Sequence, residues 1–186
     1  MLESGIPENH PLRLHFLILT EKSFHQTLNW SDPVVTEYIS NLLLYFTRTD
    51  CLYAIRNSQG NRIDTVAEML MEGDILLRAQ TIEREWEVHR HIGDYTLFMS
   101  GLFPEYLKRL KSGQKIEHPD FLIDYVRVGK KSYRRAAEFN YGRFKEWTPL
   151  YRKLAEHFEI CIAGLGLIRE ELDRSREWQS KKQILS

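Results

Sequence analysis

The segment ILLRAQTIEREWEVHRHIGDYTLFMSGLF, residues 75–103, decides the fold class of this chain. In its first part, apolar side chains recur at the 3.6-residue period of an α-helix and form one stripe. The stripe consists of Ile75, Ala79, Ile82, Trp86, Gly93 and Leu97, with His89 inside it. Beyond Ile92 the segment is apolar on nearly every side. Because a helix of this kind is buried all round, we expect it at the centre of an all-α domain.

Helical patterns also lie on both sides of this segment. Before it, Ser31-Asp32-Pro33 is typical of a helix start, since a capping oxygen precedes a proline that fits the first turn. After it, a helix is expected to open at His118-Pro119 or Asp120 and to end near Asn140. A last long helix from Thr148-Pro149 would carry a regular core seam: Leu150, Leu154, Phe158, Cys161, Leu165, Ile168 and Leu172.

Two N-terminal segments allow either helix or strand. Residues 12–19 alternate like a strand, but an isolated strand would leave its backbone unpaired, so we favour a helix there. Residues 51–66 contain the turn Asn57 to Asn61 and could form a small β-hairpin. The sequence therefore predicts an all-α, single-domain bundle of about six helices, mostly up-and-down, with a small β-hairpin as the alternative near residues 51–66.

Length and composition favour one domain. The chain has 186 residues, of which 42% are hydrophobic and 28% charged, enough for one core of ordinary globular composition. We expect a single helical domain over residues 1–176 and a frayed C-terminal tail over 177–186.

Charge and cysteine content narrow the classes of partner. Lys plus Arg and Asp plus Glu both total 26, so no global field draws the chain to nucleic acid or to an anionic membrane. Cys51 and Cys161 lie far apart and form no disulfide framework or metal motif. The apolar runs are too short for an export signal or a membrane span. We therefore expect a cytoplasmic protein with no membrane partner, for which nucleic acid is an unfavoured ligand.

Glu87, His91 and Asp94 stand at positions i, i+4 and i+7 of the central segment and so project from one side of a helix. Carboxylate and imidazole groups at this spacing can bind a divalent transition metal, as in a metal-binding protein or a metal-dependent enzyme. The structural alternative is a polar centre in which Arg84 pairs with Glu87, and His91 bonds Asp94 or a carbonyl group. In either case we expect His91 and Asp94 to be at least partly buried and to need polar partners.

An arginine followed five positions later by a histidine occurs twice, as Arg84 with His89 and as Arg152 with His157. This spacing resembles the helical motif of HEPN-domain ribonucleases. The resemblance implies that the pair helps to cleave RNA at an interface between two helical protomers. In that family Asn, Asp or His usually follows the arginine, whereas a glutamate and a lysine follow it here. We favour a buried core histidine for His157, because it falls on the core seam.

Five cations share the polar face of the helix predicted after residue 118: Arg127, Lys130, Lys131, Arg134 and Arg135. Such a strip could follow a phosphate backbone. Acidic residues lie close to it in sequence, however, and no exposed aromatic residues are interleaved for base stacking. We therefore interpret this basic face as a solvated helix surface.

A binding or scaffolding role remains as the leading hypothesis, with a homodimer formed through a helix face. Catalysis is disfavoured because the chain contains no nucleophile elbow and no phosphate loop. The helix predicted after residue 118 carries a second apolar stripe beside its main one. This stripe could serve an interface, or a buried central helix could cover it. Its members are Phe121, Leu122, Val126, Tyr133 and Ala137.

Overall fold

The computed structural model describes residues 5–7, 9–74, 79, 81–112 and 118–185, with side chains described as far as Ser175. In chain order its elements are α1 (Pro11–Glu21), the π-helix η1 (Lys22–Thr27), α2 (Pro33–Tyr45), α3 (Thr49–Leu52), α4 (Val66–Gly73), α5 (Ile82–Leu102), α6 (Pro104–Lys111), α7 (Tyr125–Glu138), the 3-10 helix η2 (Gly142–Trp147), α8 (Thr148–Glu156) and α9 (Phe158–Leu185). The prediction of an all-α fold is confirmed. No helix in the described ranges has the length and apolar character needed to cross a membrane.

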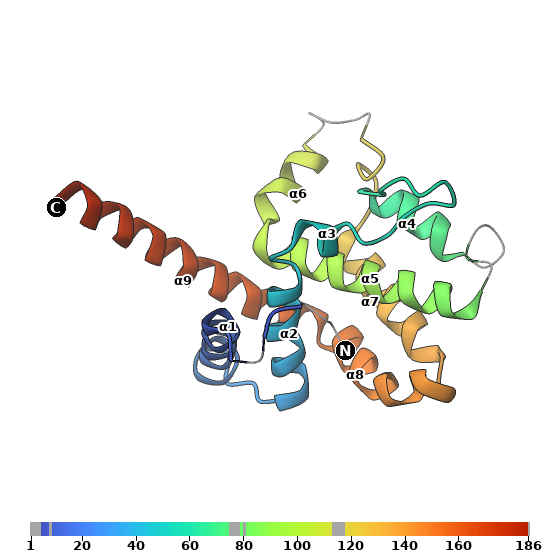
Figure 1. The fold of residues 1–186 in the computed structure, drawn as a ribbon, viewed down its shortest axis with the longest axis horizontal. Coiled ribbons are helices and arrows are strands. Elements are labelled where there is room, and N and C mark those ends of the chain that lie inside the picture. The colour runs from blue at the N-terminus through green and yellow to red at the C-terminus, as the bar shows by residue number, and fades with distance from the viewer. Residues whose placement is uncertain (1–4, 8, 75–78, 80, 113–117, 186) are drawn as a thin grey trace.

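α5 is the central helix that the apolar segment predicts. Every residue from His91 to Gly101 is buried, and α4, α7 and α9 pack around the helix. Figure 1 shows α5 crossing the middle of the helical body. The helix begins at Ile82, where Oγ1 of Thr81 accepts the Arg84 amide at 3.1 Å, and not at the start of the predicted stripe. The first residue of that stripe, Ile75, lies outside the described residues.

The two N-terminal helices both begin at a proline that follows a capping side chain. Nδ1 of His10 accepts the Leu12 amide at 3.2 Å, and Oδ1 of Asp32 accepts the Val35 amide at 3.3 Å. Residues 12–19 are therefore helical, as expected, and the predicted start of α2 is confirmed. α1 packs against α2 and α9.

The β-hairpin considered for residues 51–66 is reduced to one antiparallel bridge between Arg56 and Arg62. Oδ1 of Asn57 holds the turn by accepting the amides of Gln59 and Asn61 at 3.0 and 2.9 Å. Helices α3 and α4 leave few residues on either side of this turn, so strands cannot extend from the bridge.

The N-terminus of α4 receives its capping groups from two parts of the chain. Oγ1 of Thr65 accepts the Glu68 amide at 3.3 Å. The buried carboxylate of Asp120 accepts the amides of Val66 and Ala67 at 2.9 and 2.8 Å. Three of the amides that a helix start leaves unpaired are therefore bonded.

α7 starts at Tyr125, a few residues later than predicted. Its cap is Asp124, whose Oδ1 accepts the Arg127 amide at 3.0 Å. Asp120, one of the expected starts, bonds the hydroxyl group of Tyr125 at 2.9 Å in addition to capping α4. The difference arises because a capping residue can serve a helix that is remote in sequence, which spacing does not reveal.

The predicted last helix is divided at His157 into α8 and α9. The core seam keeps its spacing through the break, and its members are buried apart from the half-buried Leu172: Leu150, Leu154, Phe158, Cys161, Leu165 and Ile168. Figure 1 shows α9 running outward from the body to the C-terminus. α9 is helical to Leu185, and the frayed tail expected over 177–186 stays a prediction.

The arrangement of about six helices, mostly up-and-down, is not confirmed. The described residues contain nine α-helices, of which α3, α4, α6 and α8 have only four to nine residues. α5 packs mainly on α7, α9 and α4, and only slightly on α6, its neighbour in sequence. Successive described helices do pack closely together in three cases, α1 with α2, α4 with α5 and α7 with α8, but the central helix α5 also depends on α7 and α9, which do not follow it directly in the chain.

Glycines let aromatic rings lie directly against helix backbones in the core. A Cβ atom at Gly93 would lie 2.6 Å from the buried ring of Tyr133, and one at Gly164 would lie 2.3 Å from Phe24. Both distances are far below van der Waals contact. The close approach at Gly93 is thus made by a side chain of α7.

This packing predicts opposite effects for two Gly→Ala changes within helices. Gly93→Ala should lower the free energy of unfolding by about 1–3 kcal/mol, because the ring of Tyr133 must move. Gly166→Ala is the control, since its Cβ would meet nothing within 4 Å; it should raise the same quantity by about 0.5–1 kcal/mol. Urea unfolding measures both values. Equal stability of the two variants would show that α5 and α7 are not in close contact.

Candidate functional site

Asp94 is a fully buried carboxylate that accepts hydrogen bonds from three helices. Its Oδ1 accepts the hydroxyl groups of Tyr38 from α2 at 2.6 Å and Tyr133 from α7 at 2.8 Å. Its Oδ2 accepts Nη1 of Arg90, one turn earlier on α5, at 2.8 Å. An ionised carboxylate is an acceptor only, so the three donors suit the charged form of Asp94.

Burial shifts the pKa values of all members of this cluster. It raises the pKa of Asp94, an effect that Arg90 and the two tyrosine hydroxyl groups oppose. Burial, together with the neighbouring Asp94 charge, raises the pKa of Tyr38 and of Tyr133 well above the usual value. For Arg90, desolvation is the largest influence and lowers the pKa, but Asp94 and the neighbouring tyrosines together outweigh it, so the net shift is upward. The tyrosines therefore remain donors, and Arg90 remains a cation.

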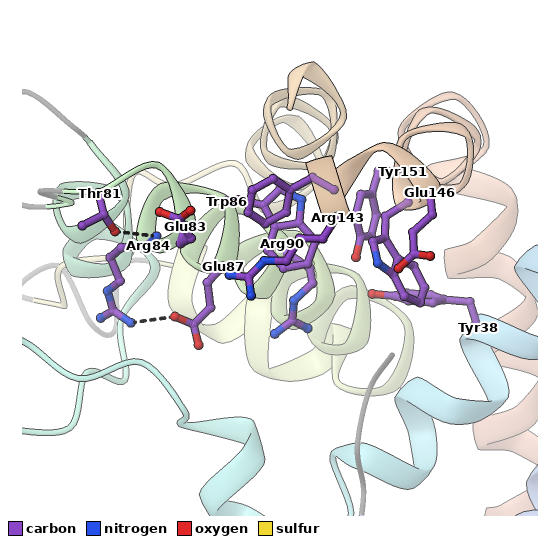
Figure 2. Close-up of a pocket in the computed structure, with 12 residues that line it drawn as sticks. Tyr38, Thr81, Glu83, Arg84, Trp86, Glu87, Arg90, Arg143, Glu146 and Tyr151 are labelled. Carbon is purple, nitrogen blue, oxygen red and sulfur yellow. Dashed lines mark hydrogen bonds and ion pairs between the residues drawn. The ribbon is translucent and has the colours of Figure 1, made fainter. Parts of the chain in front are cut away.

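Arg90 lies at a cleft of about 570 Å³ between α5, η2 and α8. Figure 2 shows its guanidinium group among the side chains that line this cleft. The lining residues are Tyr38, Thr81, Glu83, Arg84, Trp86, Glu87, Arg90, Arg143, Phe144, Glu146, Trp147 and Tyr151. Only 15% of the Arg90 side chain is exposed, and its bond to Asp94 fixes the orientation of the guanidinium group.

Stacked aromatic rings form one wall of the cleft. Trp147 stacks on Tyr151 with ring centres 6.5 Å apart, and Tyr151 stacks on Tyr133 at 5.8 Å with an interplanar angle of 10°. Trp86 lies one turn before Arg90 on α5, and its ring centre is 5.0 Å from that of Phe144. The wall is continuous with the core through Tyr133, so its rings are held in place.

Charges of both signs occupy the rim. Arg84 is bonded to Glu87 at 3.3 Å, and its Nη2 donates to the Arg56 carbonyl group at 2.6 Å. Arg143 and Glu146 are exposed side chains on η2. In Figure 2 the guanidinium group of Arg143 and the carboxylate of Glu146 both lie over the cleft.

The structure separates the three residues considered as metal ligands. The Glu87 side chain is 52% exposed on the rim, whereas His91 and Asp94 are fully buried. In the part of the chain that the structure describes, no group of three or more His, Cys, Asp or Glu side chains could hold a metal ion. The expected pairing of Arg84 with Glu87 is present.

His91 lies among aromatic rings and does not bond Asp94. Its ring centre is 5.8 Å from that of Phe46 and 6.3 Å from that of Tyr95. Neither ring nitrogen has a hydrogen-bond partner among the described residues. The nearby backbone of Leu52 raises the pKa of the ring, but less than burial lowers it. Burial, reinforced by the charge of Arg90, lowers the pKa of His91 to about 3. His91 is therefore a neutral core residue at physiological pH.

The two arginine–histidine pairs lie in different surroundings. Arg84 lies on the cleft rim, while His89 is turned inward and Nδ1 of its ring is buried without a partner among the described residues. Arg152 is exposed on α8. His157 lies at the junction of α8 and α9, with its ring centre 5.4 Å from that of Trp30. His157 is thus half-buried against an aromatic ring, and the RNA-cleaving role stays a prediction.

Two residues of the basic face form ion pairs with glutamates of the same chain. Lys130 bonds Glu159 at 2.7 Å, and Arg135 bonds the buried Glu85 at 2.5 Å. The other members, Arg127, Lys131 and Arg134, are exposed. This geometry agrees with a solvated helix surface better than with a continuous phosphate-binding strip.

Sequence reasoning missed the residues that surround Asp94. Arg90 was available as a signal, because it precedes Asp94 by four residues and charges at this spacing meet on a helix. Tyr38 and Tyr133 are 56 and 39 residues away from Asp94, so no local pattern connects them. A tyrosine on a buried stripe needs a partner for its hydroxyl group, but the sequence does not identify that partner.

No family model, no curated protein and no solved structure matches this chain.

The environment of His91 predicts a specific pH dependence of stability. Its folded pKa of about 3 lies below the unfolded value of about 6.5, so the unfolded chain takes up the proton first as the pH falls. His91 therefore disfavours folding increasingly from pH 6.5 down towards 3. Between pH 7 and pH 5, wild type should lose about 2 kcal/mol more stability than His91→Leu, which has no proton to bind.

Urea unfolding of both proteins at the two pH values measures this difference. If wild type and His91→Leu lose the same stability between pH 7 and pH 5, the ring of His91 is hydrated or bonded and not buried among apolar groups.

Proposed function

We propose that this chain is a binding protein whose cleft between α5, η2 and α8 holds a small organic carboxylate that carries a flat ring. The observation that carries the proposal is the position of Arg90, a nearly buried guanidinium group fixed by Asp94 at a cleft with aromatic walls. This proposal gives the expected binding role a definite site.

Preorganisation supports Arg90 as the anchor. The guanidinium group has five N–H donors, and the hydrogen bond to Asp94 uses one of them. Tyr38 and Tyr133 hold Asp94 in turn, so little side-chain freedom is lost when a ligand binds. A guanidinium group matches the two oxygens of a carboxylate, and its low exposure strengthens the attraction.

The remaining lining favours a ring with a single negative charge. The rings of Trp86, Phe144 and Trp147 offer apolar surface on which a flat group can stack. Three glutamates and three arginines line the cleft, so its charges balance and it offers no net attraction to a ligand with several charges, such as a nucleic-acid backbone. A monocarboxylate meets both conditions.

The other hypotheses receive less support from the described geometry. The trio proposed for a divalent metal is spread between the rim and the core, and His157 packs against Trp30. Tyr133 and Ala137 of the second apolar stripe are buried within the body, while Leu122 is 87% exposed. A homodimer remains a prediction that this stripe alone does not carry.

Titration with three naphthalene derivatives tests the proposal: 2-naphthoate, 2-naphthyl phosphate and 2-naphthylmethylamine share one ring and differ in charge. The chain has four tryptophans, two of which line the cleft, so their indole N–H signals in NMR spectra report where a ligand binds. We expect 2-naphthoate to shift the signals of Trp86 and Trp147 at millimolar concentration or below, and the amine to shift neither.

Three variants test whether Arg90 is the anchor. Arg90→Lys keeps the charge but removes the planar group, and should weaken binding of 2-naphthoate about tenfold or more. Arg152→Lys is the matched control on α8 outside the cleft and should bind as wild type does. Trp147→Leu offers a second route that leaves the Asp94 cluster intact, and should also weaken binding. The proposal fails if the amine binds as well as the carboxylate, or if Arg90→Lys folds and binds 2-naphthoate normally.

A further inference from the structure

A second, smaller hollow lies between α6, the start of α7, and the facing sides of α5 and α9. Its volume is about 260 Å³. Its walls are mostly apolar and include Pro104, Leu107, Leu110, Ile123, Val126 and Ile162. It shares no lining residue with the cleft at Arg90. The two hollows are therefore separate sites on the same central helix.

Among the described residues that line this hollow, only Ser100 has a buried side-chain polar atom without a hydrogen-bond partner. The residue is 8% exposed, and its Oγ atom is shielded from solvent and has no hydrogen-bond partner among the described residues. Buried hydroxyl groups are normally bonded, so an orphan one on the lining of a hollow indicates a missing partner. A ligand with one hydrogen-bonding oxygen would supply it.

Most of the other polar groups at this site have partners of their own. Asp120 accepts two backbone amides of α4 and the hydroxyl group of Tyr125. Lys108 bonds Glu105 at 2.9 Å, and Asp124 caps α7. Because two lysines, Lys108 and Lys111, and two aspartates, Asp120 and Asp124, line the hollow, its charges give no strong preference for either sign. The lining therefore favours a neutral ligand.

The volume sets the size of that ligand. Apolar cavities of about 150 Å³ in other proteins take up benzene, so 260 Å³ accommodates one ring with small substituents. We infer that this hollow is a binding site for a neutral, single-ring phenol or an alcohol of similar size, whose oxygen bonds Ser100 and whose ring packs against Leu107, Val126 and Ile162.

Two probes of nearly equal shape test this inference. In p-cresol a hydroxyl group stands where p-xylene has a methyl group, so their difference in affinity reports the hydrogen bond. Methyl signals of Leu107, Ile123 and Ile162 in NMR titrations locate the ligand and give its dissociation constant. We expect p-cresol to bind more tightly than p-xylene, and both to shift these signals.

Substitutions at Ser100 and at the apolar residue Val126 distinguish the hydrogen bond from the apolar contacts. Ser100→Ala should weaken p-cresol about three- to tenfold, the contribution of one neutral hydrogen bond, and leave p-xylene unchanged. Val126→Trp should fill the hollow and abolish both, whereas Leu14→Trp on the exposed face of α1 should change neither. Equal affinity of wild type for the two probes, or of Ser100→Ala and wild type for p-cresol, would overturn the inference.

The test does not depend on the carboxylate cleft. Ser100→Ala leaves every residue that lines that cleft in place, so its titration with 2-naphthoate should match that of wild type. Failure of p-cresol to bind would therefore leave the proposal for Arg90 standing. Failure of 2-naphthoate to bind would likewise leave the inference for Ser100 standing.

Discussion

The buried charge of Asp94 constrains the positions of three helices at once. A carboxylate removed from water is stable only if hydrogen-bond donors replace the solvent, and these come from Tyr38 on α2, Arg90 on α5 and Tyr133 on α7. Loss of one partner would leave the charge short of donors, a cost of several kcal/mol in typical buried pairs. The helices must therefore dock in the one register that brings all three donors together.

The Asp94 cluster also constrains the aromatic side chains that lead from the core to the cleft. Tyr133 fills the space beside Gly93 and stacks on Tyr151, which stacks in turn on Trp147. A row of rings thus runs from the centre of the core to the surface at which we place a ligand. Since Arg90 and this row both contact the Asp94 cluster, the side chains at the proposed ligand site are anchored in the core.

The sequence predicts the fold class and the location of the buried polar residues, but not their partners. The all-round apolar pattern after Ile92 predicts the central helix, and the position of His91 and Asp94 within it predicts their burial. Helix ends are predicted less well, since Asp120 caps a helix more than 50 residues away in sequence. The cleft at Arg90 escapes prediction because its lining residues come from four separate elements, α2, α5, η2 and α8, and spacing along one helix contains no information about the others.

The capping of α4 also bears on the order in which the chain folds. α4 has eight residues, and a helix of that length is not stable alone in water. Two of its first amides are bonded by a carboxylate that follows them by 53 and 54 residues. Closing so long a loop costs entropy before the helix gains its cap, so α4 is expected to become stable only after α5 and the segment that precedes α7 have come together. We therefore expect α4 to form late in folding, although it lies in the first half of the chain.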